Sequence, residues 1–387
     1  MAFSGLASNE VNTASLIQRD IAALVRTLSP KETPILDWLG DAGFSATSIK
    51  HEYVEDLMLP NTIVTSTAIN SAAVATPISI QISPAGIGLA LNIGQLLRNE
   101  SAAPEVYQVQ SITGTGNSIT ITRDYNGTTV AGSLAAGGTL YVGAAAAIEG
   151  IDHSGADTRR LGNVKVNTVG LFRMELAQST TQFNVNQVGN DQWEARKAKG
   201  LIDAMRQLEN EVVKGVRNGG SNSLGTTSAT RTMQGLQDQL TSINSTITSS
   251  SFVANPHLYI GNVWQNVFDN GGATTETWGI IAGSTWYKAL SDLNDTKVQD
   301  TNASELFQRR IRKYVGPYGE AELFLSRNIQ ATEFLLVPRE RVVVPNLQNS
   351  SFTYMEMGVG GDNRKGLIRG EYTLEAYHTS AMGRAHA

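Results

Sequence analysis

The sequence predicts an α+β fold with a small all-β domain inserted into it. Apolar residues recur every three or four positions between residues 16 and 28 and again between residues 193 and 216, which is the pattern of one helix face. Residues 77–150 lie between these patterns, are dominated by Gly, Ser, Thr and Ala, and contain only short β-prone runs. Because helical patterning lies on both sides, we interpret residues 77–150 as an inserted β domain.

Composition excludes several classes of function. The chain has 387 residues, a net charge of −5, 17 % charged residues and no cysteine. A nucleic-acid binder needs clustered cations to neutralise phosphates, so the charge balance argues against that class. The lack of cysteine excludes disulfides, thiolate nucleophiles and cysteine-ligated metal centres. We expect no signal peptide and no membrane span, because no uniformly apolar run approaches the ~18 residues that a span needs.

Two helices and a strand are expected in the N-terminal region. The first helix, over residues 16–28, should end at Ser29-Pro30, because a residue before proline is pushed out of the α region. A short second helix over Pro34–Leu39 is closed by Gly40. Residues 48–57 alternate imperfectly and are interpreted as a strand.

The insert is expected to contain four short strands, over residues 78–82, 106–112, 118–123 and 139–142. Isoleucine and threonine alternate between residues 119 and 122, which is the period of a half-buried strand. Asn126-Gly127 is the strongest turn signal in the chain, because both central positions of a type I′ turn need a positive φ. Short strands at this spacing predict a compact all-β module.

A long helix over residues 191–218 is the clearest single element. Asp191 and Glu194 stand three positions apart, as in a capping box, and Asn218-Gly219-Gly220 ends the apolar pattern. About 26 residues at ~1.5 Å each make a rod ~39 Å long. We interpret this helix as a structural spine, preceded by a strand-like stretch over residues 167–185.

The C-terminal half alternates helix and strand. Helices are expected over residues 231–243, 259–268 and 286–293. Strands are expected over residues 278–281, 310–315, 320–325, 334–337, 342–344 and 370–377, with a turn at residues 316–319. The glycine-rich residues 358–362 are interpreted as a flexible connection, since they lack the strand-to-helix setting of a dinucleotide site.

No catalytic, cofactor-binding or metal-binding residue can be assigned from motifs. There is no phosphate-cradling loop motif, no serine nucleophile elbow and no histidine pair spaced for zinc. The histidines stand singly, at positions 51, 153, 257, 378 and 386. The segment Asp292-x-Asn294-x-Thr296 lacks the glycine and glutamate that a calcium loop needs at its sixth and twelfth positions.

Two groups of charged residues stay open as functional candidates. The pairs Asp152 with Asp157 and Glu320 with Glu322 have residue types suited to acid–base work, although solvated charges are the more ordinary interpretation. The basic cluster at residues 309–313 is expected to pair with acidic residues of another subunit, and direct DNA binding is the secondary alternative.

Five stretches, taken in order, resemble the major capsid proteins of tailed bacteriophages with the Hong Kong 97-type fold. They are residues 28–40 with a Pro-x-Glu-Thr-Pro segment, residues 50–57, the helix 191–218 with residues 231–236, residues 268–293, and residues 361–375. Residues 119–129 and 140–142 are in addition similar to a small β module found within some phage structural proteins.

The resemblance implies a domain organisation around the spine helix. It divides the chain into an N-terminal arm at 1–50, extended-loop strands at 51–76 and 151–190, the inserted β domain at 77–150, a peripheral domain at 191–230 and 346–387, and an axial domain at 231–345. Some capsids of this fold crosslink a lysine to an asparagine between subunits. Lys165 is one lysine here, but no spacing singles it out and no such role is assigned.

The function that the resemblance implies is assembly rather than catalysis. Hexamers and pentamers of the chain would close an icosahedral shell in the virion around double-stranded DNA, which is enclosed without sequence-specific binding. The expected partners are other copies of the chain, with scaffolding, portal and decoration proteins, and no membrane. An encapsulin-like compartment shell is the first alternative, and a hydrolase with an accessory β domain is the second. No cofactor is expected for any shell.

Overall fold

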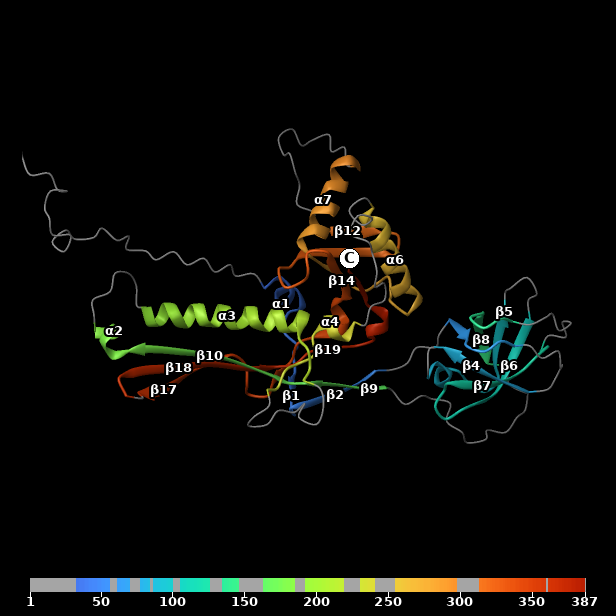
Figure 1. The fold of residues 1–387 in the computed structure, drawn as a ribbon, viewed down its shortest axis with the longest axis horizontal. Coiled ribbons are helices and arrows are strands. Elements are labelled where there is room, and N and C mark those ends of the chain that lie inside the picture. Colours follow the sequence, from blue (N-terminus) through green and yellow to red (C-terminus); the bar gives the residue numbers. More distant parts are fainter. Residues whose placement is uncertain are drawn as a thin grey trace, which may run out of the picture.

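A long helix, two open sheets and a closed barrel make up the described part of the chain (Figure 1). The computed structural model describes residues 33–55, 61–69, 77–83, 86–99, 105–125, 134–145, 163–184, 192–218, 230–240, 255–297, 313–359 and 361–386. The helix expected over residues 16–28 and the turn at Asn126-Gly127 lie outside these residues.

The first sheet is dominated by one long antiparallel pair. Its strands run in the order β1 (Ser45–Ala46), β16 (Asn346–Leu347), β18 (Asn363–Tyr372) and β10 (Gly170–Ser179), and β17 (Thr353–Val359) also pairs with β18. Strands β10 and β18 stay in register over their full length, from Gly170 opposite Tyr372 to Ser179 opposite Asn363. A regular ladder of this length provides a rigid surface against which a helix can pack.

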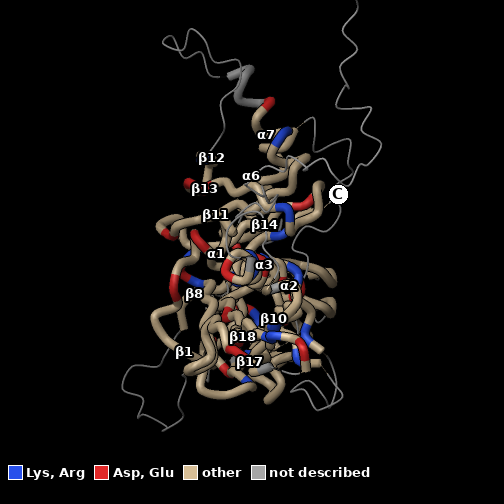
Figure 2. Tube along the Cα trace, turned by 90° about the vertical axis from the view of Figure 1, so that its left-hand side faces the viewer, with Lys and Arg blue, Asp and Glu red and all other residues tan. Residues whose placement is uncertain are grey.

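Helix α3 (Gln192–Lys214) lies over one face of this sheet (Figures 1 and 2). Gly200 permits the close approach, because a Cβ there would lie 2.8 Å from the Ile368 side chain of β18. At the start of the helix the guanidinium of Arg364 lies 4.9 Å from the ring of the buried Trp193. This helix is the predicted spine, and it is 23 residues long rather than about 26.

The second sheet combines parallel and antiparallel pairing. Its order is β12 (Lys313–Gly316), β13 (Gly319–Leu325), β11 (Trp278–Ala282), β14 (Glu333–Pro338) and β20 (Gly383–His386), and only β11 with β13 is parallel. Helices α6 (Pro256–Asp269) and α7 (Ser284–Lys297) pack on it, and three fully buried tryptophans, Trp264, Trp278 and Trp286, fill the core between them. Tryptophans bury more apolar area than other side chains, so they fix these layers firmly.

The barrel closes in the order β3 (Thr62–Thr65), β4 (Ile78–Ser83), β7 (Ser118–Thr122), β6 (Glu105–Ile112), β5 (Gln95–Asn99) and β8 (Thr139–Ala145). Its interior is a separate apolar cluster of isoleucine, leucine, valine and Tyr107. A bidentate ion pair between Arg123 and Glu105, with N–O distances of 2.8 and 2.6 Å, is buried with it. All four strands predicted here are present; β3 and β5 were not predicted.

Short elements join these parts. Helix α1 (Pro34–Leu39) matches its prediction to the residue, and β2 (Lys50–Glu55) forms a two-stranded ribbon with β9 (Asn163–Thr168). Strands β15 (Val342–Val343) and β19 (Glu375–Ala376) pair with each other. The remaining helical turns are α2 (Thr180–Asn184), α4 (Leu236–Gln239), η1 (Ile87–Ala90), η2 (Arg339–Arg341) and η3 (Thr379–Ala381). A core of α1, α3, α4 and β14 side chains packs where these elements meet.

The helix expected over residues 231–243 is wrong for its first five residues, which are not helical, and residues 241–243 lie outside the described residues. The Gly235 N–H donates to the Gly215 carbonyl at 2.8 Å, and the Asn218 N–H donates to Thr232 Oγ1 at 3.0 Å. A Cβ on Gly215 would lie 2.7 Å from the Met233 carbonyl oxygen. The two segments therefore pair side by side, which also ends α3 at Lys214 instead of residue 218.

The strand-like stretch over residues 167–185 is also different from its prediction. It is split between β9 and β10 at Val169, and residues 180–184 are helical (α2). Val169 is fully buried, and its N–H donates to the Ile49 carbonyl at 2.9 Å, so the chain turns there from one ladder to another. The expected strands over 278–281, 320–325, 334–337 and 342–344 are present as β11, β13, β14 and β15.

Candidate assembly surfaces

The β2–β9 ribbon has one buried face and one exposed face. Val54 and Val164 stand directly opposite each other in the ladder, and they are 63 % and 53 % exposed. On the other face, Tyr53 and Glu55 are buried against the chain around β19. A cross-strand valine pair left in solvent is a surface that gains free energy when another protein covers it.

A buried carboxylate anchors the ribbon. Glu375 of β19 contacts the His51 imidazole, and the Tyr377 hydroxyl donates to it at 2.5 Å. The Tyr53 hydroxyl lies 3.3 Å from the Ala376 carbonyl oxygen, and burial raises the pKa of Tyr53 to about 12. Burial and the Glu375 carboxylate likewise raise the pKa of Tyr377, so both phenols stay neutral and donate.

A second buried carboxylate, Glu55, fixes the end of the same strand. It accepts a hydrogen bond from the His378 N–H at 2.9 Å, and the Lys165 ammonium lies 3.9 Å from it. His378 holds a left-handed φ of 52°, which turns this N–H towards the carboxylate. The ribbon is thus tied at its base by buried polar contacts, while its valine face stays exposed.

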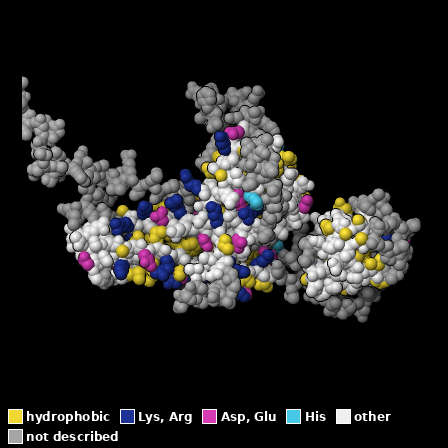
Figure 3. Space-filling view, in the orientation of Figure 1, with side chains coloured by type: hydrophobic (Ala, Val, Ile, Leu, Met, Phe, Trp, Pro, Cys, Tyr) yellow, Lys and Arg dark blue, Asp and Glu magenta, His cyan; other side chains and the backbone are white. Residues whose placement is uncertain are grey.

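The long sheet presents a mixed surface at its free edge. Met355 and Met357 lie two positions apart on β17, and each is 53 % exposed. Ion pairs between Arg173 and Glu175 and between Arg364 and Glu356 lie on the same sheet. Figure 3 shows hydrophobic side chains interspersed with charges of both signs over α3 and this sheet. Flexible methionines beside balanced charges suit a contact with another protein.

Helix α3 adds two exposed apolar residues to that surface. Leu201 and Met205 lie one turn apart and are 42 % and 40 % exposed, whereas Leu208 and Val212 further along are buried. The helix therefore buries one face in the subunit and leaves part of another open.

A buried carboxylate, Glu333, connects the second sheet to α4. Glu333 is fully buried; it accepts from the Arg384 guanidinium at 2.6 Å and from Gln237 Nε2 at 2.7 Å. Arg384 also donates to the Gln237 carbonyl at 2.8 Å. These contacts connect β14, β20 and α4.

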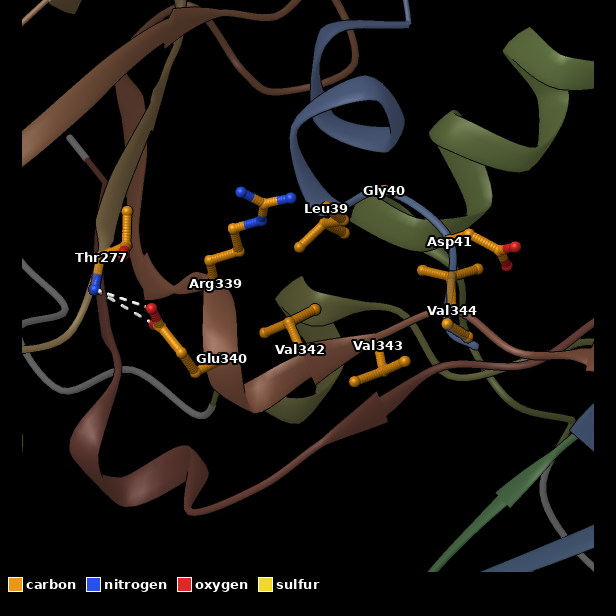
Figure 4. A pocket seen from close by; sticks show the side chains of 10 residues that line it. Leu39, Gly40, Asp41, Thr277, Arg339, Glu340, Val342, Val343 and Val344 are labelled. Atoms are coloured by element: carbon orange, nitrogen blue, oxygen red, sulfur yellow. Dashed lines mark hydrogen bonds between the residues drawn. The ribbon is translucent and has the colours of Figure 1, made fainter. Parts of the chain in front are cut away.

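A crevice of about 350 Å³ opens beside α1 (Figure 4). Its lining comes from the end of α1, the residue before β11, η2 and β15. The Thr277 N–H donates to both Glu340 carboxylate oxygens, at 3.2 and 3.1 Å, and Arg339 points towards Leu39 (Figure 4). Burial alone raises the pKa of Glu340, but hydrogen bonds from Thr277 and the charge of Arg339 lower it overall. No histidine, serine or lysine is among the described residues that line the crevice.

The histidines and the Asp292–Thr296 segment, which the sequence analysis considered as possible ligands, lie in different parts of the described structure. His51 and His378 lie on neighbouring elements, but His257 and His386 lie elsewhere, on α6 and β20. Asp292, Asn294 and Thr296 belong to helix α7, not to a loop. Among the described residues no group of three or more histidines or carboxylates could hold a metal ion.

Some of the charged candidates lie among the described residues, and others lie outside them. Glu320 pairs with Lys313 across the β12–β13 hairpin, which makes it a surface charge. Lys165 pairs with Glu55, as described above. Asp152, Asp157, His153 and residues 309–312 lie outside the described residues.

Strand β17, which carries exposed residues of the long sheet, was not predicted from the sequence. Residues 358–362 were expected to be a loop, yet Gly358 and Val359 end strand β17, with a bulge after Glu356 and a φ of 58° at Gly358. The alternation of Thr353, Met355 and Met357 was the available signal for this strand.

Comparison with solved structures identifies the class of fold. The cyanophage A-1(L) capsid has a TM-score of 0.50 at 10 % identity, with 97 % of this chain and 98 % of that chain covered. The capsid of a native GTA particle has a TM-score of 0.49 at 8 % identity, covering 98 % of each chain. The SrpI encapsulin from Synechococcus elongatus PCC 7942 has a TM-score of 0.41 at 13 % identity, covering 58 % of this chain and 75 % of that one. The chain has the Hong Kong 97-type fold of phage capsid subunits.

The family follows from the sequence itself. Residues 6–387 match the SU10 major capsid protein family, so the chain belongs to that family. A comparison with curated proteins gave no match. The protein is a phage major capsid protein, a structural component of the virion and not an enzyme. Among the described helices, none is long and apolar enough to cross a membrane.

Proposed function

We propose that this capsid protein assembles as hexamers and pentamers into an icosahedral head that encloses double-stranded DNA. The observation that carries the proposal is the family match over residues 6–387. Exposed apolar surfaces on the ribbon, the spine and β17 support it, because they offer each subunit several separate contact areas. Many modest contacts repeated by symmetry can hold a closed shell together.

The proposed domains follow the strands of the structure. The second sheet with α6 and α7 corresponds to an axial domain at residues 231–345, to which β20 adds its strand. The spine and the long sheet correspond to the peripheral domain, and the β2–β9 ribbon to the extended loop that reaches a neighbouring subunit. The barrel is proposed as an insertion at the tip of that loop, beginning near residue 61 rather than 77 because β3 belongs to it.

The charge of the chain favours a shell that encloses DNA over a shell that binds DNA tightly. The net charge is −5, and two cations of the spine are paired with carboxylates of the same helix, Lys197 with Glu194 and Arg206 with Asp203. A shell of this composition holds DNA by confinement, since tight phosphate binding needs an excess of clustered cations. Scaffolding, portal and decoration proteins are the additional partners proposed for assembly.

Electron microscopy of the expressed chain tests the proposal. We expect rings and closed shells from the unmodified chain, with DNA in particles purified from infected cells. Val54→Asp should reduce shell yield at least about tenfold, because a desolvated carboxylate costs several kcal/mol at a contact. Unchanged circular dichroism would show that the variant subunit is folded. Uniform monomers of the unmodified chain under all conditions would contradict the proposal, as would particles filled with enzyme instead of DNA.

A further inference from the structure

The spine helix α3 carries cations along one side of its length. At 3.6 residues per turn, four basic residues fall within about 80° of the helix circumference: Arg196, Lys199, Arg206 and Lys214. Lys199 and Lys214 are exposed, and neither forms an ion pair with another described residue. The one carboxylate of α3 within this arc is Asp203, which lies 3.6 Å from the Arg206 guanidinium. We call this arc the cationic side; it holds three positive charges in excess.

The cationic side lies towards the free edge of the long sheet. The Arg196 guanidinium donates to the Ala177 carbonyl of β10 at 3.0 Å. The next residue, Lys197, instead lies 4.5 Å from the ring centre of Tyr354 on β17, on the far side of β18. The strand order ends at β10, so no further strand of the described chain covers this edge. Figure 3 shows Lys and Arg side chains along the length of α3.

The opposite side of the helix is apolar. Leu201 and Met205 lie about 140–180° from Arg196 around the helix axis, and they are 42 % and 40 % exposed. The cationic side has no such residues, and its other exposed positions, Gln207 and Asn210, carry amides. Contacts between proteins have an apolar centre, whereas contacts with DNA are polar and strongly positive. The two sides of α3 therefore fit different partners.

The surroundings do not cancel this charge. On β10, Arg173 and Glu175 pair with each other at 2.8 Å. The next carboxylate along the helix, Glu211, is partly buried, and burial raises its pKa. Outside the described residues, the segments 185–191 and 219–229 before and after the helix contain by sequence a single charged residue, an aspartate. The excess of cations is thus a local feature of the spine in a chain whose net charge is −5.

We propose that the cationic side of α3 contacts the phosphates of the enclosed DNA, while the apolar side contacts protein. The inference rests on the proposed function and adds the orientation of the subunit: the free edge of β10 faces the inside of the shell. Phosphate contacts carry no base information, so the binding is independent of sequence. Amides such as those of Gln207 and Asn210 also bond to phosphate oxygens.

Three excess charges make this contact weak. At a slope of about 0.9 per neutralised phosphate, the DNA affinity of one subunit would fall about 40-fold between 50 and 200 mM salt. Contacts of this strength, repeated over the shell, keep DNA close to the wall without fixing its position. They agree with a shell that holds DNA by confinement.

Site-specific photo-crosslinking in filled heads tests which partner each side of α3 meets. The photo-reactive residue p-benzoylphenylalanine in place of Lys199 should crosslink the chain to DNA in heads purified from infected cells. The same residue in place of Leu201 is the matched control, because Leu201 is exposed on the opposite side of the same helix. We expect at least about fivefold more DNA to stay attached after denaturation at position 199 than at position 201, where crosslinks to protein should dominate.

A second experiment tests the charges. In Lys199→Gln combined with Lys214→Gln, the slope of log affinity against log salt for dissociated subunits and a DNA duplex should fall by about 1.8, at 0.9 per lost contact. Lys288→Gln combined with Lys313→Gln is the matched control, because both lysines are exposed and belong to α7 and β12. This control should leave the slope unchanged, and circular dichroism shows that each variant is folded.

The outcomes separate the two proposals. Filled heads in which position 199 crosslinks only to protein, or in which positions 199 and 201 reach DNA equally, would overturn the DNA-facing side and leave the shell function standing. A salt slope unaffected by Lys199→Gln with Lys214→Gln would overturn it too. A failure of the unmodified chain to form particles, or particles without DNA, would overturn the proposed function and this contact with it.

Discussion

Glu209 is a buried carboxylate in the spine helix with an unusual proton affinity. It is 1 % exposed, and burial raises its pKa to about 7, although hydrogen bonds from the Leu36 and Ile35 backbone act in the opposite direction. One carboxylate oxygen, Oε2, has no hydrogen-bond partner. The residue connects the spine to the start of α1, where the N-terminal segment enters the core.

The stability of the subunit should depend on pH through this group. A carboxylate with a raised folded pKa stabilises the fold below its unfolded pKa near 4.5, and that stabilisation is lost as pH rises towards 7. The free energy of unfolding should therefore fall by on the order of 3 kcal/mol between pH 4.5 and pH 8 on account of Glu209. Denaturant unfolding of dissociated subunits across this range measures it.

Glu209→Gln should flatten this pH profile and stabilise the subunit at pH 8. The control is Glu194→Gln, since Glu194 lies on the same helix with a side chain 64 % exposed and only a surface ion pair to lose. An unchanged slope in Glu209→Gln would show that another group carries the pH dependence.

The contacts of single residues were the least predictable part of the molecule. His51 and Glu375 are 324 positions apart, and Arg231 meets Glu371 across 140 positions, so no local spacing indicates either pair. His51 is partly buried, and its ring contacts the Glu375 carboxylate.

Gly283, at the junction of β11 and α7, allows the backbone of residues 330–333 to approach closely. A Cβ on Gly283 would lie 2.7 Å from the Ala331 carbonyl oxygen and closer still to that of Gln330. The Gly283 N–H also donates to the Glu333 carbonyl at 2.9 Å. Backbone atoms on both sides leave no flexible side chain to move aside.

Two glycine-to-alanine substitutions in neighbouring elements should have opposite effects. Gly283→Ala should destabilise the subunit by at least about 2 kcal/mol, because the backbone of β11 and the segment before β14 must separate. Gly261→Ala should stabilise it by about 0.5–1 kcal/mol, since Gly261 lies inside helix α6 with open space around it. Thermal unfolding measures both, and equal effects of the same sign would contradict the packing described.

Elements with strong local signals were predictable, and those set by distant contacts were not. Proline at position 34 and glycine at position 40 bound α1 to the residue. Residues 231–235 carry a helical pattern, yet they are not helical and are hydrogen-bonded to residues 215–218 instead. Strand β5 (Gln95–Asn99) has only two apolar residues, Leu96 and Leu97, and its place in the barrel depends on β6 and β8.

The whole molecule contains apolar cores that do not share residues. The barrel cluster comprises residues between 63 and 142, whereas the other two clusters draw on α1, α3, α4, α6, α7 and the second sheet. The Val142 N–H donates to the Asn61 carbonyl at 2.9 Å, so the chain enters and leaves the barrel at adjacent points. A unit that has its own core and whose two ends lie close together can be removed without disturbing the rest of a chain.

Removal of the barrel should therefore leave the rest of the subunit folded. A chain in which a short Gly-Ser link replaces residues 62–141 should keep the unfolding temperature of the remaining core within about 4 °C, because it loses none of the buried side chains of that core. Scanning calorimetry should show one transition fewer than in the full chain. Ile121→Ala, a truncation of a fully buried barrel residue, is the matched control, and it should lower only the barrel transition, at a cost of about 2–5 kcal/mol. If the barrel-free chain were unfolded, or if Ile121→Ala lowered every transition equally, barrel and spine would form one cooperative unit, and the insertion would be a structural part of the capsid fold.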